Sequence, residues 1–194
     1  MTRAHATRLR EPPPSLPVPR QVEAYCERFP GESKRLAPLL RALARGDDVH
    51  SRRTSNGHLS ASAIVLRSER LLAVHHPYLQ RWMQPGGHLD DGESPQLAAL
   101  RETLEETGTC TRLHPWHDTH PCPVDIDIHS IPANPSRQEG AHLHFDFRYV
   151  MVCESESSER AELPTRWAVP DELEHAGLGR LILRLRTLGL LGAG

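Results

Sequence analysis

The sequence is poor in lysine: Lys34 is the only one among 23 basic residues, so almost all of the positive charge comes from arginine. Acidic residues balance that charge, and the formal net charge is -2. Without a basic excess, the composition has no electrostatic footprint of a nucleic-acid-binding protein. Arginine binds phosphates well, but GC-rich coding produces the same bias and is the simpler explanation.

The four cysteines lack the spacing of a disulfide framework or of a cysteine zinc site, because no two of them form a C-x-x-C pair. They are Cys26, Cys110, Cys122 and Cys153. This distribution fits a reducing compartment, and we expect a cytoplasmic protein.

Long apolar runs are also missing. The first residues contain no apolar segment of the kind found in secretory signals. The leucine-rich segment near residue 185 is interrupted by Arg180, Arg184 and Arg186, which excludes a membrane-spanning helix. We therefore expect a soluble protein that does not bind membranes.

The chain divides into three predicted parts. Residues 1–19 are rich in proline and are predicted to form a flexible arm. Apolar residues recur at helical spacing within 22–29 and again within 36–43, which predicts a helical hairpin over 20–46. A larger domain is predicted over 55–192, a length sufficient for a full hydrophobic core.

Within that domain the pattern alternates between strands and helices. Segments 61–66 and 71–74 flank a polar turn and predict a hairpin, and further strands are predicted over 125–129 and 142–152. An apolar stripe over 178–188 predicts a closing helix that docks on the sheet. The acidic and serine-rich run 154–159 is predicted to be a solvated loop, and His114, His117 and His120 to be loop histidines.

The most informative segment is a predicted helix over 94–107. Ser94 is a good N-cap, Pro95 suits the first helical position, and Gly108 suits the position just after the last turn. Helical geometry places Leu97, Leu100 and Leu104 on one side of this helix.

Three carboxylates lie on the opposite side, on Glu102, Glu105 and Glu106. Like charges at these spacings repel each other and destabilise a helix. A hard divalent cation would relieve the repulsion, since Mg²⁺ prefers carboxylate oxygens and is often completed by substrate phosphates. A solvated acidic face is the alternative, and the preceding glycine turn at 86–87 together with Arg101 makes it the weaker one.

Residues 87–109 resemble the signature of the Nudix hydrolases, G-x5-E-x7-R-E-U-x-E-E-x-G-U, where U is a bulky aliphatic residue. The positions that match are Gly87, Glu93, Arg101, Glu102, Glu105, Glu106 and Gly108. The two U positions hold Thr103 and Thr109, although the resemblance implies aliphatic residues packed against the sheet there. The flanks 82–85 and 166–173 extend the resemblance over about 57–175.

The resemblance implies a fold, an activity and a set of roles. The fold would be a Nudix-like α/β/α sandwich with a mixed sheet. The activity would be divalent-metal-dependent hydrolysis of a diphosphate bond in a nucleoside diphosphate linked to another moiety, or in a related organic pyrophosphate. Mg²⁺, or Mn²⁺ in its place, would be bound by Gly87, Glu102, Glu105 and Glu106.

Further roles also follow from the resemblance. Glu102, Glu105 and Arg101 would form the catalytic set, with Glu102 or a nearby loop carboxylate as the base. Glu93 would support the structure, holding the loop and the helix together with Arg101.

Two later strands carry polar residues on alternate positions, and these residues are candidates for lining a substrate cleft. They are Asp127, His129, His142, His144 and Arg148, and Trp82 and His88 are further candidate substrate-binding residues. Half-exposed strands with water-facing side chains are an equal alternative for the strand residues. A packed tryptophan is favoured for Trp82, and a separate zinc site at the H-x-H pair is disfavoured.

Two alternative functions stay open at this point. One is an enzyme resembling isopentenyl-diphosphate isomerase, which needs a cysteine before the box, yet no cysteine lies between Cys26 and Cys110. The other is a non-catalytic nucleotide-binding or regulatory module, which usually loses the box carboxylates that are all present here. We expect a small-molecule nucleotide or organic diphosphate as partner and no nucleic acid, and a homodimer is the candidate assembly.

Overall fold

The computed structural model describes residues 15–135, 139–157 and 161–192. Most of the predicted arm therefore lies outside the described residues. Two N-terminal helices follow it, α1 (Val18–Arg28) and α2 (Ala37–Arg45), with a short 3-10 turn at Pro30–Glu32 between them. Helix α2 ends at Gly46, whose φ of 74° lies in the left-handed region that glycine adopts readily.

The centre of the molecule is a mixed sheet built on two long parallel strands, β1 (His58–Arg67) and β7 (His142–Glu156). β2 (Arg70–His76) and β4 (Gly86–His88) pair antiparallel with β1. β5 (Thr109–Leu113) and β6 (Asp125–Ile131) pair antiparallel with β7. β3 (Arg81–Met83) and β8 (Thr165–Ala168) both pair with β2.

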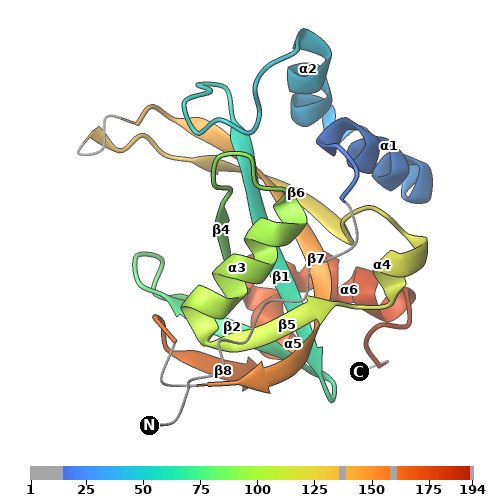
Figure 1. Ribbon diagram of the computed structural model, residues 1–194, viewed down its shortest axis with the longest axis vertical. Helices are drawn as coiled ribbons and strands as arrows, with labels where there is room; N and C mark the ends of the chain where they lie inside the picture. Colours follow the sequence, from blue (N-terminus) through green and yellow to red (C-terminus); the bar gives the residue numbers. More distant parts are fainter. Residues whose placement is uncertain (1–14, 136–138, 158–160, 193–194) are drawn as a thin grey trace, which may run out of the picture.

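Helices cover both faces of this sheet (Figure 1). Helix α3 (Pro95–Thr107) covers one face, where it packs with Leu59, Phe145 and Phe147 in the larger core cluster. On the other face α5 (Pro170–Leu173), a π-helical turn (Glu174–Leu178) and α6 (Gly179–Thr187) pack with Ile64 and Val150. The predicted α/β/α sandwich with a mixed sheet and a preceding helical hairpin is thus confirmed.

The predicted helix and hairpin positions agree with the structure, but several short elements were missed. Strands β3, β4, β5 and β8 and helix α4 (Trp116–Thr119) were not predicted. The predicted solvated loop at 154–159 is wrong over Glu154–Glu156, because this segment continues β7 and pairs with β5. Ser157 is irregular, and residues 158–160 lie outside the described residues.

The cysteine thiols and the lengths of the helices are two further features of the fold. All four cysteines carry free thiols. None of the described helices is long and apolar enough to cross a bilayer.

Candidate active site

The glycine pair at 86–87 lies in strand β4, beside Ser60–Ser62 of β1. A Cβ atom at Gly86 would collide with the backbone of Ala61 and Ser62, and one at Gly87 would collide with the carboxylate of Glu102. Only glycine therefore lets β4 approach β1 and helix α3 this closely. The consequence is that the Gly87 backbone lies directly against the Glu102 side chain.

Helix α3 has the ends that its sequence predicts. The Ser94 hydroxyl accepts a hydrogen bond from the Leu97 N–H at 3.4 Å, and Pro95 occupies the first turn. Gly108, with φ of 65°, ends the helix by donating its N–H to the Leu104 carbonyl. These caps fix which residues of the helix face β4.

The buried face of α3 differs from the leucine side expected from the sequence. Leu100 is buried, but Leu97 is 40% exposed. Thr103 is fully buried, and its hydroxyl donates to the Ala99 carbonyl at 2.6 Å. Thr109 is also buried, and its N–H donates to the Thr107 hydroxyl at 3.1 Å. The two threonines at aliphatic positions of the motif are thus accommodated by local hydrogen bonds.

Arg101 joins the loop after β4 to the helix. Its guanidinium donates to both oxygens of Glu93, at 3.0 and 2.9 Å, and to the His88 carbonyl at 2.9 Å. Its remaining group donates to Glu102 and Glu105, each at 3.0 Å. The Glu93 carboxylate also accepts the Asp90 N–H at 2.9 Å. The pair therefore fixes the loop against α3, and the hydrogen bonds that Arg101 donates to Glu93 raise the pKa of Arg101.

The three glutamates of α3 have different surroundings. Glu106 accepts the Gly86 N–H at 2.9 Å, and burial, reinforced by neighbouring carboxylates, raises its pKa to about 7. Burial also raises the pKa of Glu102, against the opposing effect of Arg101. The Glu105 side chain is 47% exposed. Arg101 holds two of the carboxylates and Gly86 the third, and the three do not gather their oxygens within 4.8 Å of one another.

This donor set fits a hard divalent cation. It offers carboxylate oxygens and the nearby Gly87 backbone, without sulfur or nitrogen ligands. Two of its carboxylates, on Glu102 and Glu106, are half-buried one helical turn apart, which disfavours their charged forms. A dication would offset that cost, so Glu102, Glu105, Glu106 and Gly87 are the residues that could hold it.

The polar residues of β6 and β7 lie on one face of the sheet, together with polar residues of β1. His129 lies opposite His144 and Asp127 opposite Asp146 in the β6–β7 pair, and β1 places His58 beside His144. This face is the one that carries α5 and α6, whereas α3 packs on the other. Residues in β1, β6 and β7 therefore form one polar surface, as the alternation in β6 and β7 suggested.

Half of this polar surface is a buried ion-pair network. Arg148 is 5% exposed and donates to Asp146 at 2.9 Å and to Asp125 and Asp127 at 3.2 Å each. Arg180 and Arg184 of α6 also donate to Asp125. Burial alone would raise the pKa of Asp127, but His129, Arg148 and Arg180 lower it. The network occupies the Arg148 guanidinium and ties α6 to the sheet.

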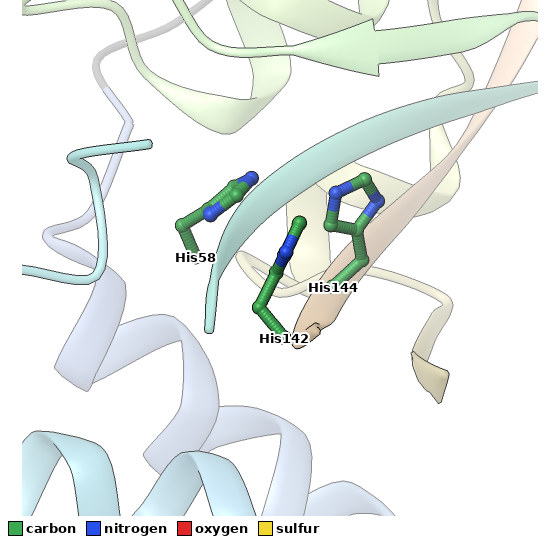
Figure 2. A group of neighbouring side chains, drawn as sticks. All are labelled: His58, His142 and His144. Carbon is green, nitrogen blue, oxygen red and sulfur yellow. The ribbon is translucent and has the colours of Figure 1, made fainter. Parts of the chain in front are cut away.

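The other half is a cluster of histidines at a cavity of about 860 Å³. His58, His88, His142 and His144 line it, together with Arg52 and Arg53. Figure 2 shows His58, His142 and His144 with their rings near one another. Burial, reinforced by neighbouring histidines, lowers the pKa of His58 to about 4 and of His144 to about 2. His129 is exposed at the edge of the cluster.

Trp82 lies elsewhere. It packs against the second core cluster, and the Arg166 guanidinium is 4.6 Å from its ring centroid. The structure thus gives Trp82 protein partners and does not place it among the residues lining the histidine cavity.

Two residues were missed or misread from the sequence. His58 received no role, and no local pattern marks it, because its neighbours come from β7. His117 was expected in a loop, but it lies in α4 and is buried. Its Nδ1 donates to the Cys122 carbonyl and its Nε2 accepts the Val150 N–H, both at 3.1 Å. His117 thus supplies the hydrogen-bond acceptor for Val150. That residue lies between the part of β7 that pairs with β6 and the part that pairs with β5.

A comparison with protein families identifies the domain. The NUDIX domain model matches residues 57–181, which is more than half of the chain and includes β4, α3 and the histidine cluster. The chain belongs to the NUDIX family. The resemblance seen in residues 87–109 is thereby confirmed, and the match begins after the N-terminal hairpin.

Curated relatives of this NUDIX protein share parts of the chain. It is 39% identical over 106 residues to the "Probable DHNTP pyrophosphohydrolase" of Lactococcus lactis subsp. cremoris, covering 55% of this chain and 60% of that protein. It is 41% identical over 56 residues to an RNA pyrophosphohydrolase of Agrobacterium fabrum, covering 27% of this chain and 33% of that protein. The chain thus spans less than two thirds of the length of these relatives.

Solved structures of the family are more distant in sequence. A NUDIX-family hydrolase from Clostridium perfringens is 18% identical, with a TM-score of 0.47, and the match covers 68% of this chain and 97% of that one. A NUDIX hydrolase from Nitrosomonas europaea gives the same TM-score at 21% identity, covering 68% of this chain and 88% of that one.

Proposed function

We propose that this protein hydrolyses a diphosphate bond in a nucleoside diphosphate derivative or related organic pyrophosphate, using a divalent cation. The observation that carries the proposal is the packing of Gly87 against Glu102, with Glu106 hydrogen-bonded to Gly86. This arrangement sets two carboxylates of α3 against the backbone of β4, and the family match and the pyrophosphohydrolase relatives support the proposal.

In this proposal Glu102, Glu105, Glu106 and the Gly87 carbonyl hold Mg²⁺, with Mn²⁺ able to substitute. When bound, such an ion polarises a phosphoryl oxygen and lowers the pKa of a water molecule. Arg101 and Glu93 keep the β4 loop and α3 in register through the hydrogen bonds described above. Arg101 also orients Glu102 and Glu105.

The proposed reaction is a substitution at phosphorus. The oxygen of water forms a new bond to phosphorus, and the bond from phosphorus to the bridging oxygen breaks. Glu102 accepts a proton from the water, and the leaving phosphate carries away the bonding electron pair. The products are a monophosphate and the phosphorylated remainder of the substrate. Where the substrate is a triphosphate, pyrophosphate is the second product.

Two broader features belong to the same proposal. Residues 55–192 form the catalytic unit and the hairpin 20–46 is an addition to it, which the family match beginning at residue 57 supports. The partner is a small molecule and not a nucleic acid, and the four free thiols suit the cytoplasm. The predicted homodimer would be tested by light scattering on the purified chain.

A substrate panel tests the proposal. ADP-ribose, nucleotide sugars, dinucleoside polyphosphates, nucleoside triphosphates and the DHNTP of the lactococcal relative's name would be incubated with Mg²⁺, with Mn²⁺, and with EDTA. We expect cleavage of at least one compound with either metal and none with EDTA. In ¹⁸O-labelled water, the label should enter a phosphate product. Cleavage that persists in EDTA, or no cleavage across the panel, would refute the proposal.

A further inference from the structure

The histidine cluster lies apart from the carboxylates of α3 in chemistry and in position. Three of its members, His58, His142 and His144, come from β1 and β7 and lie on the sheet face opposite α3. Among the described residues, His58, His142 and His144 are the group of metal-ligating side chains whose ligand atoms all lie within 4.8 Å of one another. Imidazole nitrogen is a ligand for zinc and similar transition metals, whereas Mg²⁺ prefers oxygen.

His58 is the decisive member of the cluster. It is only 3% exposed, and neither of its ring nitrogens has a hydrogen-bond partner in the described structure. Buried polar atoms are normally satisfied, and leaving one unsatisfied costs about 1–3 kcal/mol. An imidazole buried at a polar cavity without a partner therefore calls for a ligand.

The other two histidines are held in orientations that suit metal binding. The Nδ1 of His142 lies 2.8 Å from the Gly140 carbonyl, which can only accept, so Nδ1 carries the proton and Nε2 carries the lone pair. The Nε2 of His144 lies 3.2 Å from the Nε2 of His88. When His144 donates in that pair, its Nδ1 keeps a lone pair. A metal-ligating histidine usually donates its other N–H in this way.

We propose that His58, His142 and His144 form a three-histidine site for a transition-metal dication such as Zn²⁺, separate from the carboxylate site of α3. Nitrogens of a tetrahedral zinc site lie about 3.4 Å apart, as zinc–nitrogen bonds of about 2.0–2.1 Å require. The rings of His58 and His142 are stacked, with centroids 4.8 Å apart and planes at 27°. Binding therefore requires rotation of at least one ring about its Cβ–Cγ bond.

The surroundings indicate what the fourth coordination position would take. Three protein ligands leave one position open in a four-coordinate zinc site. The cavity of about 860 Å³ adjoins the cluster, and Arg52 and Arg53 line it as well. Water or an anionic oxygen, such as that of a phosphate or carboxylate, suits a position beside these two cations. The metal site itself does not depend on the proposed hydrolase activity.

Metal titration tests the site directly. Chelator-treated protein would be titrated with Zn²⁺ by calorimetry and with Co²⁺ by visible absorption, in the wild type and in His142→Ala and His144→Gln. His50→Ala is the matched control, because His50 is exposed and outside the cluster. Glu105→Gln removes a carboxylate of α3 and distinguishes the two sites. Circular dichroism would verify that each variant is folded.

We expect one Zn²⁺ per chain, with intense Co²⁺ bands typical of tetrahedral coordination. Each cluster variant should weaken Zn²⁺ binding at least ~10-fold, while His50→Ala and Glu105→Gln leave it unchanged. Equal affinity in the wild type and in folded cluster variants would overturn the proposal. An equal loss of Zn²⁺ affinity in Glu105→Gln would also overturn it. So would a wild type that binds no Zn²⁺ while His144→Gln changes the KM for substrate, because the histidines would then serve substrate binding. Loss of diphosphate hydrolysis with Zn²⁺ binding intact would instead count against the proposed function alone.

Discussion

His117 is expected to make the stability of this fold sensitive to acid. Both of its nitrogens are used in the neutral form, since Nδ1–H donates to Cys122 and Nε2 accepts from Val150. A proton on Nε2 would break the second bond and place a charge in the core. Burial accordingly lowers the pKa of His117 from about 6.5 to about 4.

The magnitude follows from that difference. Between these two pKa values the unfolded chain binds more protons than the native one, so stability rises with pH there. The native state has its full advantage above pH 6.5 and loses it as the pH falls toward 4. A shift of this size corresponds to about 3 kcal/mol at one site.

Urea unfolding at pH 7.5 and pH 4.5 would measure this term in the wild type and in His117→Asn. At pH 7.5 the variant should be less stable by about 1–3 kcal/mol, because the Val150 N–H loses its acceptor. At pH 4.5 the difference should shrink by about 2–3 kcal/mol, since only the wild type has lost the histidine term. A difference that is the same at both pH values would refute the reasoning. Other histidines titrate in both proteins and cancel in the comparison.

Three further substitutions test the packing of the site. Arg101→Lys keeps the charge but cannot bridge both oxygens of Glu93. It should lower the free energy of unfolding by about 1–3 kcal/mol in urea titrations. An unchanged urea midpoint would contradict the role given to the paired hydrogen bonds between Arg101 and Glu93. Thr103→Val restores an aliphatic residue and leaves the Ala99 carbonyl its helical bond, so the free energy of unfolding should change by less than ~1 kcal/mol; a loss above ~2 kcal/mol would show that the hydroxyl is required. Asp125→Asn leaves Arg148 and the arginines of α6 without their shared buried carboxylate, and should cost about 3–5 kcal/mol in thermal or urea unfolding; a loss below ~1 kcal/mol would contradict the account of the network.

Local signals were sufficient to predict the helix of the box. Ser94, Pro95 and Gly108 act within one turn of the helix ends, so the sequence alone locates them, and the structure places the caps there. The long strands were predictable for a similar reason, because alternation in β1 and β7 persists over many residues. Strands β3 and β4 have three residues each, too few to show a period.

The rest depended on contacts between distant segments. Glu154–Glu156 looks like a solvated loop, yet β5 provides it with a pairing partner more than forty residues away in sequence. His58 joined the histidine cluster only through its register beside His144. Leu97 was expected on the apolar side of α3, but the sheet contacts the neighbouring face, which carries Leu100 and Thr103.

The central claim is that the carboxylates of α3 support hydrolysis of a diphosphate bond. The most direct test is kcat/KM for the best panel substrate with Mg²⁺, in the wild type, Glu105→Gln and Glu27→Gln. Glu27 is exposed on α1, so its substitution makes the same charge change away from the site. Loss of a metal-held charge predicts a fall of at least ~100-fold in Glu105→Gln, with Glu27→Gln unchanged. Equal activity in the wild type and Glu105→Gln would contradict the assignment.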